Sequence, residues 1–177
     1  MNPFGQLGLT PTLTLSDADL REAFRTAGKS AHPDAGGNSD HFAVLQKAFT
    51  LLSSPSRRLR CWLEAKAISG EERGAISPEL LDLFARVGQA LQQADSVGKQ
   101  REAALSALAK AMLEPATQQA RETLEDSLEA VATAIDTETA RFPELEAGHG
   151  DPWRVARDLA FLEKWQAELK ARFAALW

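Results

Sequence analysis

Cysteine and tyrosine are scarce in this sequence of 177 residues, which has one cysteine, Cys61, and no tyrosine. A single cysteine excludes an internal disulfide framework and fits a reducing compartment. The chain also has only three scattered histidines, so no spacing typical of zinc ligands exists. We therefore expect neither a metal site nor a resident cofactor.

Long apolar runs are missing too, and the opening residues do not predict a leader peptide. No uninterrupted apolar stretch approaches the roughly 20 residues that cross a bilayer. The opening MNPFGQLGLTPTLT lacks the charged start and apolar run of a secretory signal. A formal net charge of −5 argues against a dedicated nucleic-acid binder, which would usually be basic. We expect a cytoplasmic protein that binds neither membranes nor nucleic acid.

Signatures of catalysis are equally hard to find. The sequence has no phosphate-binding loop, no metal-ligand cluster and no nucleophile with a nearby base pattern. The acidic pair Glu71-Glu72 lies in a glycine-containing segment, where its carboxylates stay solvated. We expect a protein that is not an enzyme.

Helix-forming residues make up most of what is present. Alanine, leucine, glutamate, glutamine and arginine are abundant, β-branched runs are few, and 44% of the residues are hydrophobic. These features predict an all-α fold. The segment SGEERGAISP, with two glycines, a proline and three charges, divides the chain. We predict a compact helical unit over residues 1–68, a linker over 69–77 and an antiparallel three-helix bundle over 78–177.

A basic amphipathic helix is predicted to begin after Ser16, with Asp19 three positions later as a short-acid capping box. Its apolar face includes Leu20 and Phe24. A second, basic stripe lies beside that face at i, i+4 and i+8, and consists of Arg21, Arg25 and Lys29. The helix should end before Pro33, and an apolar helix should begin near Ser39 or Asp40.

In the second half, the periodicity predicts helices over about 78–94, over about 98–142 with a break or kink at Pro115, and from about 152 onward. Helical phase places Leu80 and Phe84 on the core face of the first of these. Leu81 lies about 100° from Leu80, and Phe161 lies outside the main apolar stripe of the last helix.

Between the two N-terminal helices stands KSAHPDAGGNSD, residues 29–40, with His32-Pro33-Asp34 at the mouth of a glycine-rich loop. By itself this tripeptide fits a plain Pro-Asp turn. Here a basic helix precedes it, and an apolar helix of the form F-x-x-L-x-x-A-F-x-x-L follows. That arrangement resembles the J domain of DnaJ-type co-chaperones, an antiparallel helical hairpin with an HPD loop, over residues 4 to about 63.

Further segments are similar to HscB, the J-domain co-chaperone of iron–sulfur cluster assembly. They are FGQLGLTP followed by TLTLSDADLREAF, then SPELLDLFARVGQALQQAD and VARDLAFLEKWQAELKARFAALW. The resemblance implies a chaperone-binding site made by His32, Pro33, Asp34, Arg21, Arg25 and Lys29. Its implied partner is a DnaK/HscA-type chaperone ATPase, whose ATP hydrolysis the protein would stimulate.

The same resemblance implies that the bundle binds an IscU-like iron–sulfur scaffold protein. The matching client-binding positions are Leu80, Leu81, Phe84 and Phe161. The carboxylates that flank this patch in HscB are replaced by Ala85, Gly88 and Gln92. Helical phase makes Leu81 and Phe161 the better candidates for an exposed patch. Two alternatives stay open: a J-domain protein with a different client, and a helical interaction scaffold that contacts no chaperone.

Overall fold

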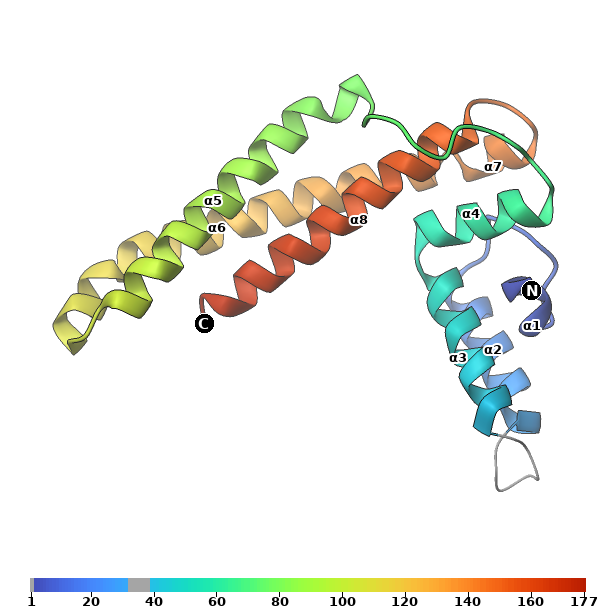
Figure 1. The fold of residues 1–177 in the computed structure, drawn as a ribbon, viewed down its shortest axis with the longest axis horizontal. Coiled ribbons are helices and arrows are strands. Elements are labelled where there is room, and N and C mark those ends of the chain that lie inside the picture. Colours follow the sequence, from blue (N-terminus) through green and yellow to red (C-terminus); the bar gives the residue numbers. More distant parts are fainter. Residues whose placement is uncertain (1, 32–38) are drawn as a thin grey trace. The chain divides into compact units, whose positions relative to one another are not determined.

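A computed structural model describes residues 2–31 and 39–177. Over these two ranges the chain forms helices joined by turns and extended segments, and it contains no strand (Figure 1). The predicted all-α fold is therefore confirmed. No helix in the described ranges combines the length and the apolar content needed to span a membrane.

The contacts divide the chain into two compact units. The first contains Met1–Gly74 together with Thr139–Leu159, and the second contains Ala75–Glu138 together with Ala160–Trp177. Residues 139–159 thus cluster with the N-terminal segment rather than with the rest of the second half. The predicted functional division at residues 69–77 stays a prediction.

The first unit is built around an antiparallel helical hairpin. Helix α2 (Asp17–Ala31) and helix α3 (Ser39–Ser53) lie side by side, with α1 (Pro3–Gln6) packed on α3 and α4 (Pro55–Ala65) following it (Figure 1). Half of the predicted capping box at α2 is confirmed: the Ser16 hydroxyl accepts the Asp19 backbone N–H at 3.1 Å, whereas the Asp19 carboxylate accepts the Ser16 hydroxyl at 2.6 Å in place of the Ser16 backbone N–H. The hairpin therefore begins where the sequence indicates.

Two charged side chains, one buried and one partly buried, hold the segment between α1 and α2 in place by hydrogen bonds. The guanidinium of Arg58 on α4 is 7% exposed and donates to the carbonyls of Leu52 at 2.8 Å and Leu15 at 2.7 Å. The Glu146 carboxylate, on α7 (Phe142–Glu146), accepts the Leu13 backbone N–H at 2.6 Å and the Thr12 hydroxyl at 2.7 Å. These bonds explain why residues 142–146 belong to the first unit.

The glycine-rich segment after α4 lies against the first turns of α8 (Pro152–Ala175), within the first unit. A Cβ added at Gly70 would overlap the indole ring of Trp153, so this close approach requires glycine. The Arg157 guanidinium also donates to the backbone carbonyl of Glu71. Residues 70–74 thus contact α8 at Gly70, Glu71 and Gly74 while they stay exposed.

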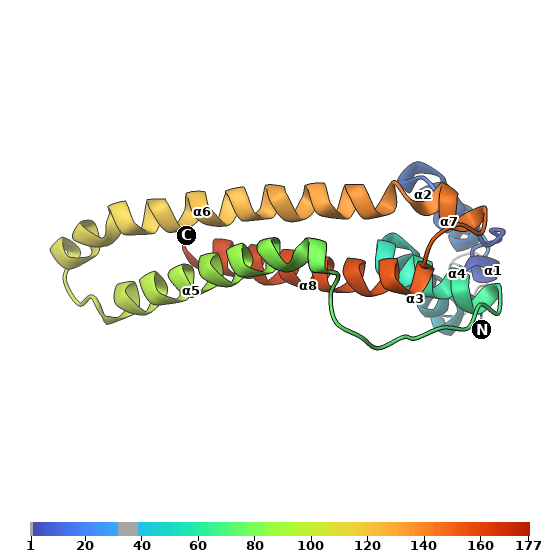
Figure 2. The same cartoon turned by 90° about the horizontal axis from the view of Figure 1, so that it is seen from above.

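The second unit is a three-helix bundle. A 3₁₀ turn (Pro78–Leu80) leads into α5 (Leu81–Ala103), α6 (Ala107–Thr139) runs back alongside it, and the later part of α8 is the third helix (Figure 2). Buried positions alternate at spacings of three and four, which is the pattern of coiled-coil-like packing. On α5 and the turn before it they are Leu80, Val87, Ala90, Ala94 and Val97, with Leu83 partly buried.

Of the two alternatives for Pro115, the predicted break is wrong, and the kink stays a prediction. The chain leaves the helix at residues 104–106 instead, and Pro115 lies inside α6. Ser106 explains the position of the break, because its hydroxyl accepts the backbone N–H of Ala109 at 3.1 Å and its carbonyl accepts that of Lys110. A good N-cap and the bundle packing together outweigh one lost helical hydrogen bond.

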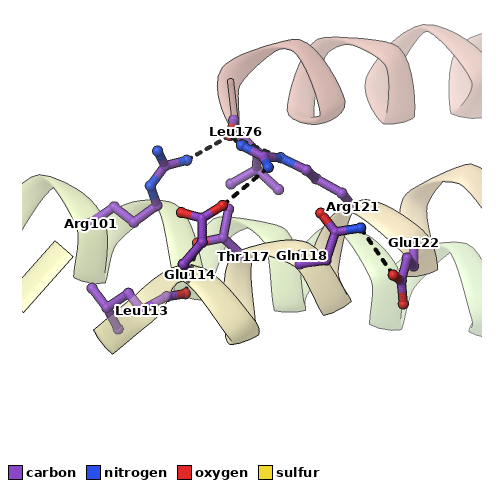
Figure 3. Close-up of polar contacts among 8 residues, drawn as sticks. All are labelled: Arg101, Leu113, Glu114, Thr117, Gln118, Arg121, Glu122 and Leu176. Atoms are coloured by element: carbon purple, nitrogen blue, oxygen red, sulfur yellow. Dashed lines mark hydrogen bonds and ion pairs between the residues drawn. The ribbon is translucent and has the colours of Figure 1, made fainter. Parts of the chain in front are cut away.

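The end of α8 is clamped by two arginines (Figure 3). The Leu176 carbonyl accepts the Arg101 guanidinium of α5 at 2.6 Å and Arg121 Nε of α6 at 3.2 Å. The Arg121 guanidinium also lies 4.3 Å from the ring centroid of Trp177, a cation–π distance. Beyond this clamp the α5–α6 hairpin continues past the end of α8 (Figures 1 and 2).

Candidate functional site

The predicted HPD loop falls between the two described ranges. His32, Pro33 and Asp34 lie outside the described residues, which stop at Ala31 and resume at Ser39. The helices on either side are those predicted, with α2 ending at Ala31 and α3 beginning at Ser39.

The basic stripe is on the surface of α2. Arg21, Arg25 and Lys29 are all exposed. Arg25 forms an ion pair with Glu22 on the same helix, and both side chains remain more than half exposed. Such a pair contributes little to stability and is easily exchanged for another partner.

The neighbouring apolar face of α2 holds the hairpin together. Leu20 is 1% exposed, and the ring of Phe24 lies 4.9 Å from that of Phe49 and 6.0 Å from that of Phe42, centroid to centroid. Because aromatic packing against α3 fixes the rotation of α2, the basic stripe is held on the outer surface. The geometry provides an exposed, positively charged helix face that precedes, in the sequence, the segment that contains HPD.

Comparison with known proteins supports a J-domain relationship. Over 47 residues the chain is 45% identical to the tetratricopeptide repeat and J domain-containing co-chaperone DNJ1 of Cryptococcus neoformans var. grubii. The match covers 25% of this chain and only 9% of the length of that protein. No family model matches the sequence. No solved structure matches it.

The class that emerges is that of a J-domain co-chaperone relative. The short match suggests that class, and the helical hairpin is consistent with it. None of them tests the finer resemblance to HscB.

The candidate client patch lies on the second unit, and its exposed residues differ from those predicted. Leu80 is buried at 9% exposure and Leu81 is 52% exposed, as predicted. Phe84, predicted to face the core, is 53% exposed, so that prediction is wrong. Phe161 is partly buried and packs against the bundle core.

The spacing of the core explains the error at Phe84. The buried stripe passes through Leu83 and Val87, so Phe84 falls one residue, or about 100°, beyond it. Its ring rests on the edge of the core, 5.6 Å from the ring of Trp165 on α8. Phe161 contacts the same indole, at 6.3 Å between ring centroids.

Trp165 is the residue that sequence reasoning missed. It is 6% exposed, and its ring contacts the rings of both phenylalanines. The signal was its position four residues after Phe161, which places the two side chains on one helix face. We call Leu81, Phe84 and Phe161 the α5 patch; its two phenylalanines both contact the ring of Trp165.

The rim of the α5 patch carries little charge along α5. Ala85, Gly88 and Gln92 continue the exposed face, and nothing lies within 4 Å of a Cβ added at Gly88. A partner can therefore approach the backbone of α5 closely beside Phe84. Such a surface favours apolar contact over ion pairing.

Proposed function

We propose that this protein is a J-domain co-chaperone that stimulates the ATPase of a DnaK/HscA-type chaperone and catalyses nothing itself. The observation that carries the proposal is the 45% identity to a J domain-containing co-chaperone in a chain that also has His32-Pro33-Asp34 between two helices. The first unit would dock on the chaperone, and docking would accelerate ATP hydrolysis in the partner.

Electrostatics would bring the two proteins together. Arg21, Arg25 and Lys29 form an exposed positive face that attracts an acidic surface and raises the association rate. Asp34 would then form a charge-assisted pair with an arginine of the chaperone, as the resemblance implies. Pro33 restricts the backbone before it, which lowers the entropy lost when the loop docks.

The second unit would hold the client. We propose that the α5 patch binds an IscU-like iron–sulfur scaffold protein and delivers it to the chaperone. Two exposed apolar side chains over a buried tryptophan have the composition of an interface centre. A second client class is favoured by one observation, the uncharged Ala85, Gly88 and Gln92 at the rim, since the carboxylates of HscB are absent there.

One pair of assays tests both parts. Adding the full chain to a DnaK/HscA-type chaperone should raise its steady-state ATPase rate, and a chain that leaves the rate unchanged contradicts the co-chaperone function. Titration with the scaffold protein, read by calorimetry, should give saturable binding. If stimulation occurs without scaffold binding, the protein is a J-domain protein with another client.

A further inference from the structure

A groove in the first unit remains unused by the proposed function. It has a volume of about 520 Å³ and is lined mainly by α3 and α4, with α1 at one side. Val44, Lys47 and Leu51 follow at i, i+3 and i+7 on α3. Arg57, Arg60 and Cys61 follow at i, i+3 and i+4 on α4. Each helix therefore presents one continuous face to the groove.

This face of α3 differs from the face that builds the hairpin. Leu45, Ala48 and Leu52 are the fully buried positions of the helix, each 1% exposed or less. Val44 is 36% exposed and Leu51 is partly buried, so the groove side of α3 keeps apolar surface in contact with solvent. Cys61, 9% exposed, adds a thiol to the same apolar lining.

Cations dominate the charges of the groove, although the chain as a whole carries −5. The lining contains three cations and one carboxylate, that of Glu64. Lys47 and Arg57 are exposed, and the described part of the chain supplies no ion-pair partner to either side chain. An apolar floor with a positive rim is complementary to an amphipathic, acidic ligand.

The third cation of the groove, Arg60, already has a carboxylate partner within the chain. Arg60 Nη1 donates to the Glu72 carboxylate at 2.6 Å. Glu72 lies in the non-helical segment after α4, where the backbone has no regular secondary structure. Arg60 thus already binds a carboxylate that comes from a segment without regular secondary structure.

We propose that this groove binds an acidic peptide segment of a partner protein. Apolar side chains of the peptide fill the floor between Val44, Leu51 and Cys61, and its carboxylates pair with Lys47 and Arg57. The volume suits a few side chains rather than a folded surface. The site would give the first unit a second contact, separate from the basic stripe on α2.

The test uses the full chain and a synthetic peptide of twelve residues with blocked ends, built from glutamate and leucine and labelled with fluorescein. One control peptide replaces glutamate by lysine, and another replaces leucine by serine. Fluorescence anisotropy measures binding. Because Cys61 is the sole cysteine, its alkylation by a maleimide reports occupancy of the groove. The acidic amphipathic peptide should bind and slow that alkylation, and both control peptides should bind at least tenfold more weakly.

Three variants test whether the peptide binds in the groove. The double substitution Lys47→Gln/Arg57→Gln should weaken peptide binding about tenfold, since each exposed ion pair contributes several-fold. Glu72→Gln frees Arg60 and should strengthen binding about threefold. Arg21→Gln/Arg25→Gln removes the same amount of charge from α2 and should leave peptide binding unchanged.

Absence of binding by the acidic peptide overturns the proposal, as does equal binding of the lysine peptide. Equal loss in the Arg21→Gln/Arg25→Gln variant also overturns it, because binding would then follow net charge rather than the groove.

Discussion

The ring of Phe84 lies 5.6 Å from that of Trp165, so an exposed phenylalanine on α5 rests on a buried tryptophan of α8. This contact gives Phe84 a fixed position while half of its surface remains open to solvent. An aromatic side chain held in this way loses little conformational entropy on binding, which is a property of interface hot spots. The α5 patch is therefore the part of the second unit that should bind a client.

The double variant Leu81→Ala/Phe84→Ala should lose client binding while keeping its fold. Each side chain is about half exposed, so truncation removes binding surface and leaves the bundle core intact. At about 25 cal/mol per Å² of apolar surface, the loss should exceed tenfold in affinity for the scaffold protein, measured by calorimetry.

The matched control is Leu105→Ala/Leu108→Ala. These two leucines lie at the far end of the α5–α6 hairpin and are 98% and 73% exposed. Binding should be unchanged in this control. Equal weakening in both double variants would place the client elsewhere.

Glu146 should stabilise the first unit through its contacts with residues 12–14. Its carboxylate accepts two side-chain hydroxyls and the backbone N–H of Leu13, so Glu146→Ala leaves a part-buried N–H without its acceptor. We expect a loss of roughly 2 kcal/mol in the free energy of unfolding, measured by urea denaturation followed by circular dichroism.

Glu146→Gln retains the Oε1 acceptor that serves Thr12 and Leu13, and should cost less than the alanine variant. Glu144→Ala, at an exposed position of the same short helix, should have no effect. If Glu144→Ala and Glu146→Ala cost the same, the bridge does not stabilise the unit.

The thiol of Cys61 should lose its proton at a higher pH than an ordinary thiol does. Burial, and to a smaller extent the carboxylate of Glu64, raise the pKa of Cys61 above its ordinary value. Once the pH exceeds the ordinary thiol pKa, the unfolded chain releases this proton while the folded chain keeps it. The contribution of Cys61 to stability is therefore fully present at neutral pH and falls as the pH rises through the folded pKa.

Two measurements check this. The alkylation rate of Cys61 should rise at a higher pH than that of a free thiol. Between about pH 8 and 10, the wild type should lose stability relative to Cys61→Ala in urea denaturation. Identical pH profiles for the wild type and Cys61→Ala would exclude a raised pKa.

Salt should weaken stimulation of the chaperone. Exposed charges are screened over about 10 Å at 0.1 M ionic strength, so docking through the basic stripe loses its attraction as salt is added. Stimulation by the wild type should fall several-fold from about 0.05 to 0.5 M salt, after correction for the chaperone alone. Arg21→Gln/Arg25→Gln/Lys29→Gln should stimulate weakly at low salt and show a flatter salt profile. Stimulation by the wild type that does not change with salt would argue against electrostatic docking.

Local signals predicted much of the fold. Ser16 with Asp19 located the start of α2, and apolar periodicity located α3 and α8, because caps and helix faces are set by neighbouring residues. The break at Pro115 was misplaced because bundle packing outweighs the local cost of proline.

Contacts between distant residues could not be predicted in the same way. The bonds from Glu146 to residues 12–14 span more than 130 positions, and the Arg101 and Arg121 bonds to the Leu176 carbonyl span 75 and 55. No periodic pattern marks such pairs. The error at Phe84 has a related cause: the core stripe runs through Leu83 and Val87, and a shift of one residue in that stripe decides between buried and exposed.

The ATPase rate of a DnaK/HscA-type chaperone in the presence of wild type or of His32→Gln tests the central claim most directly. The account predicts strong stimulation by the wild type, none by His32→Gln, and the same circular dichroism spectrum and unfolding midpoint for both chains. Equal stimulation by the two chains would contradict a J-domain mechanism.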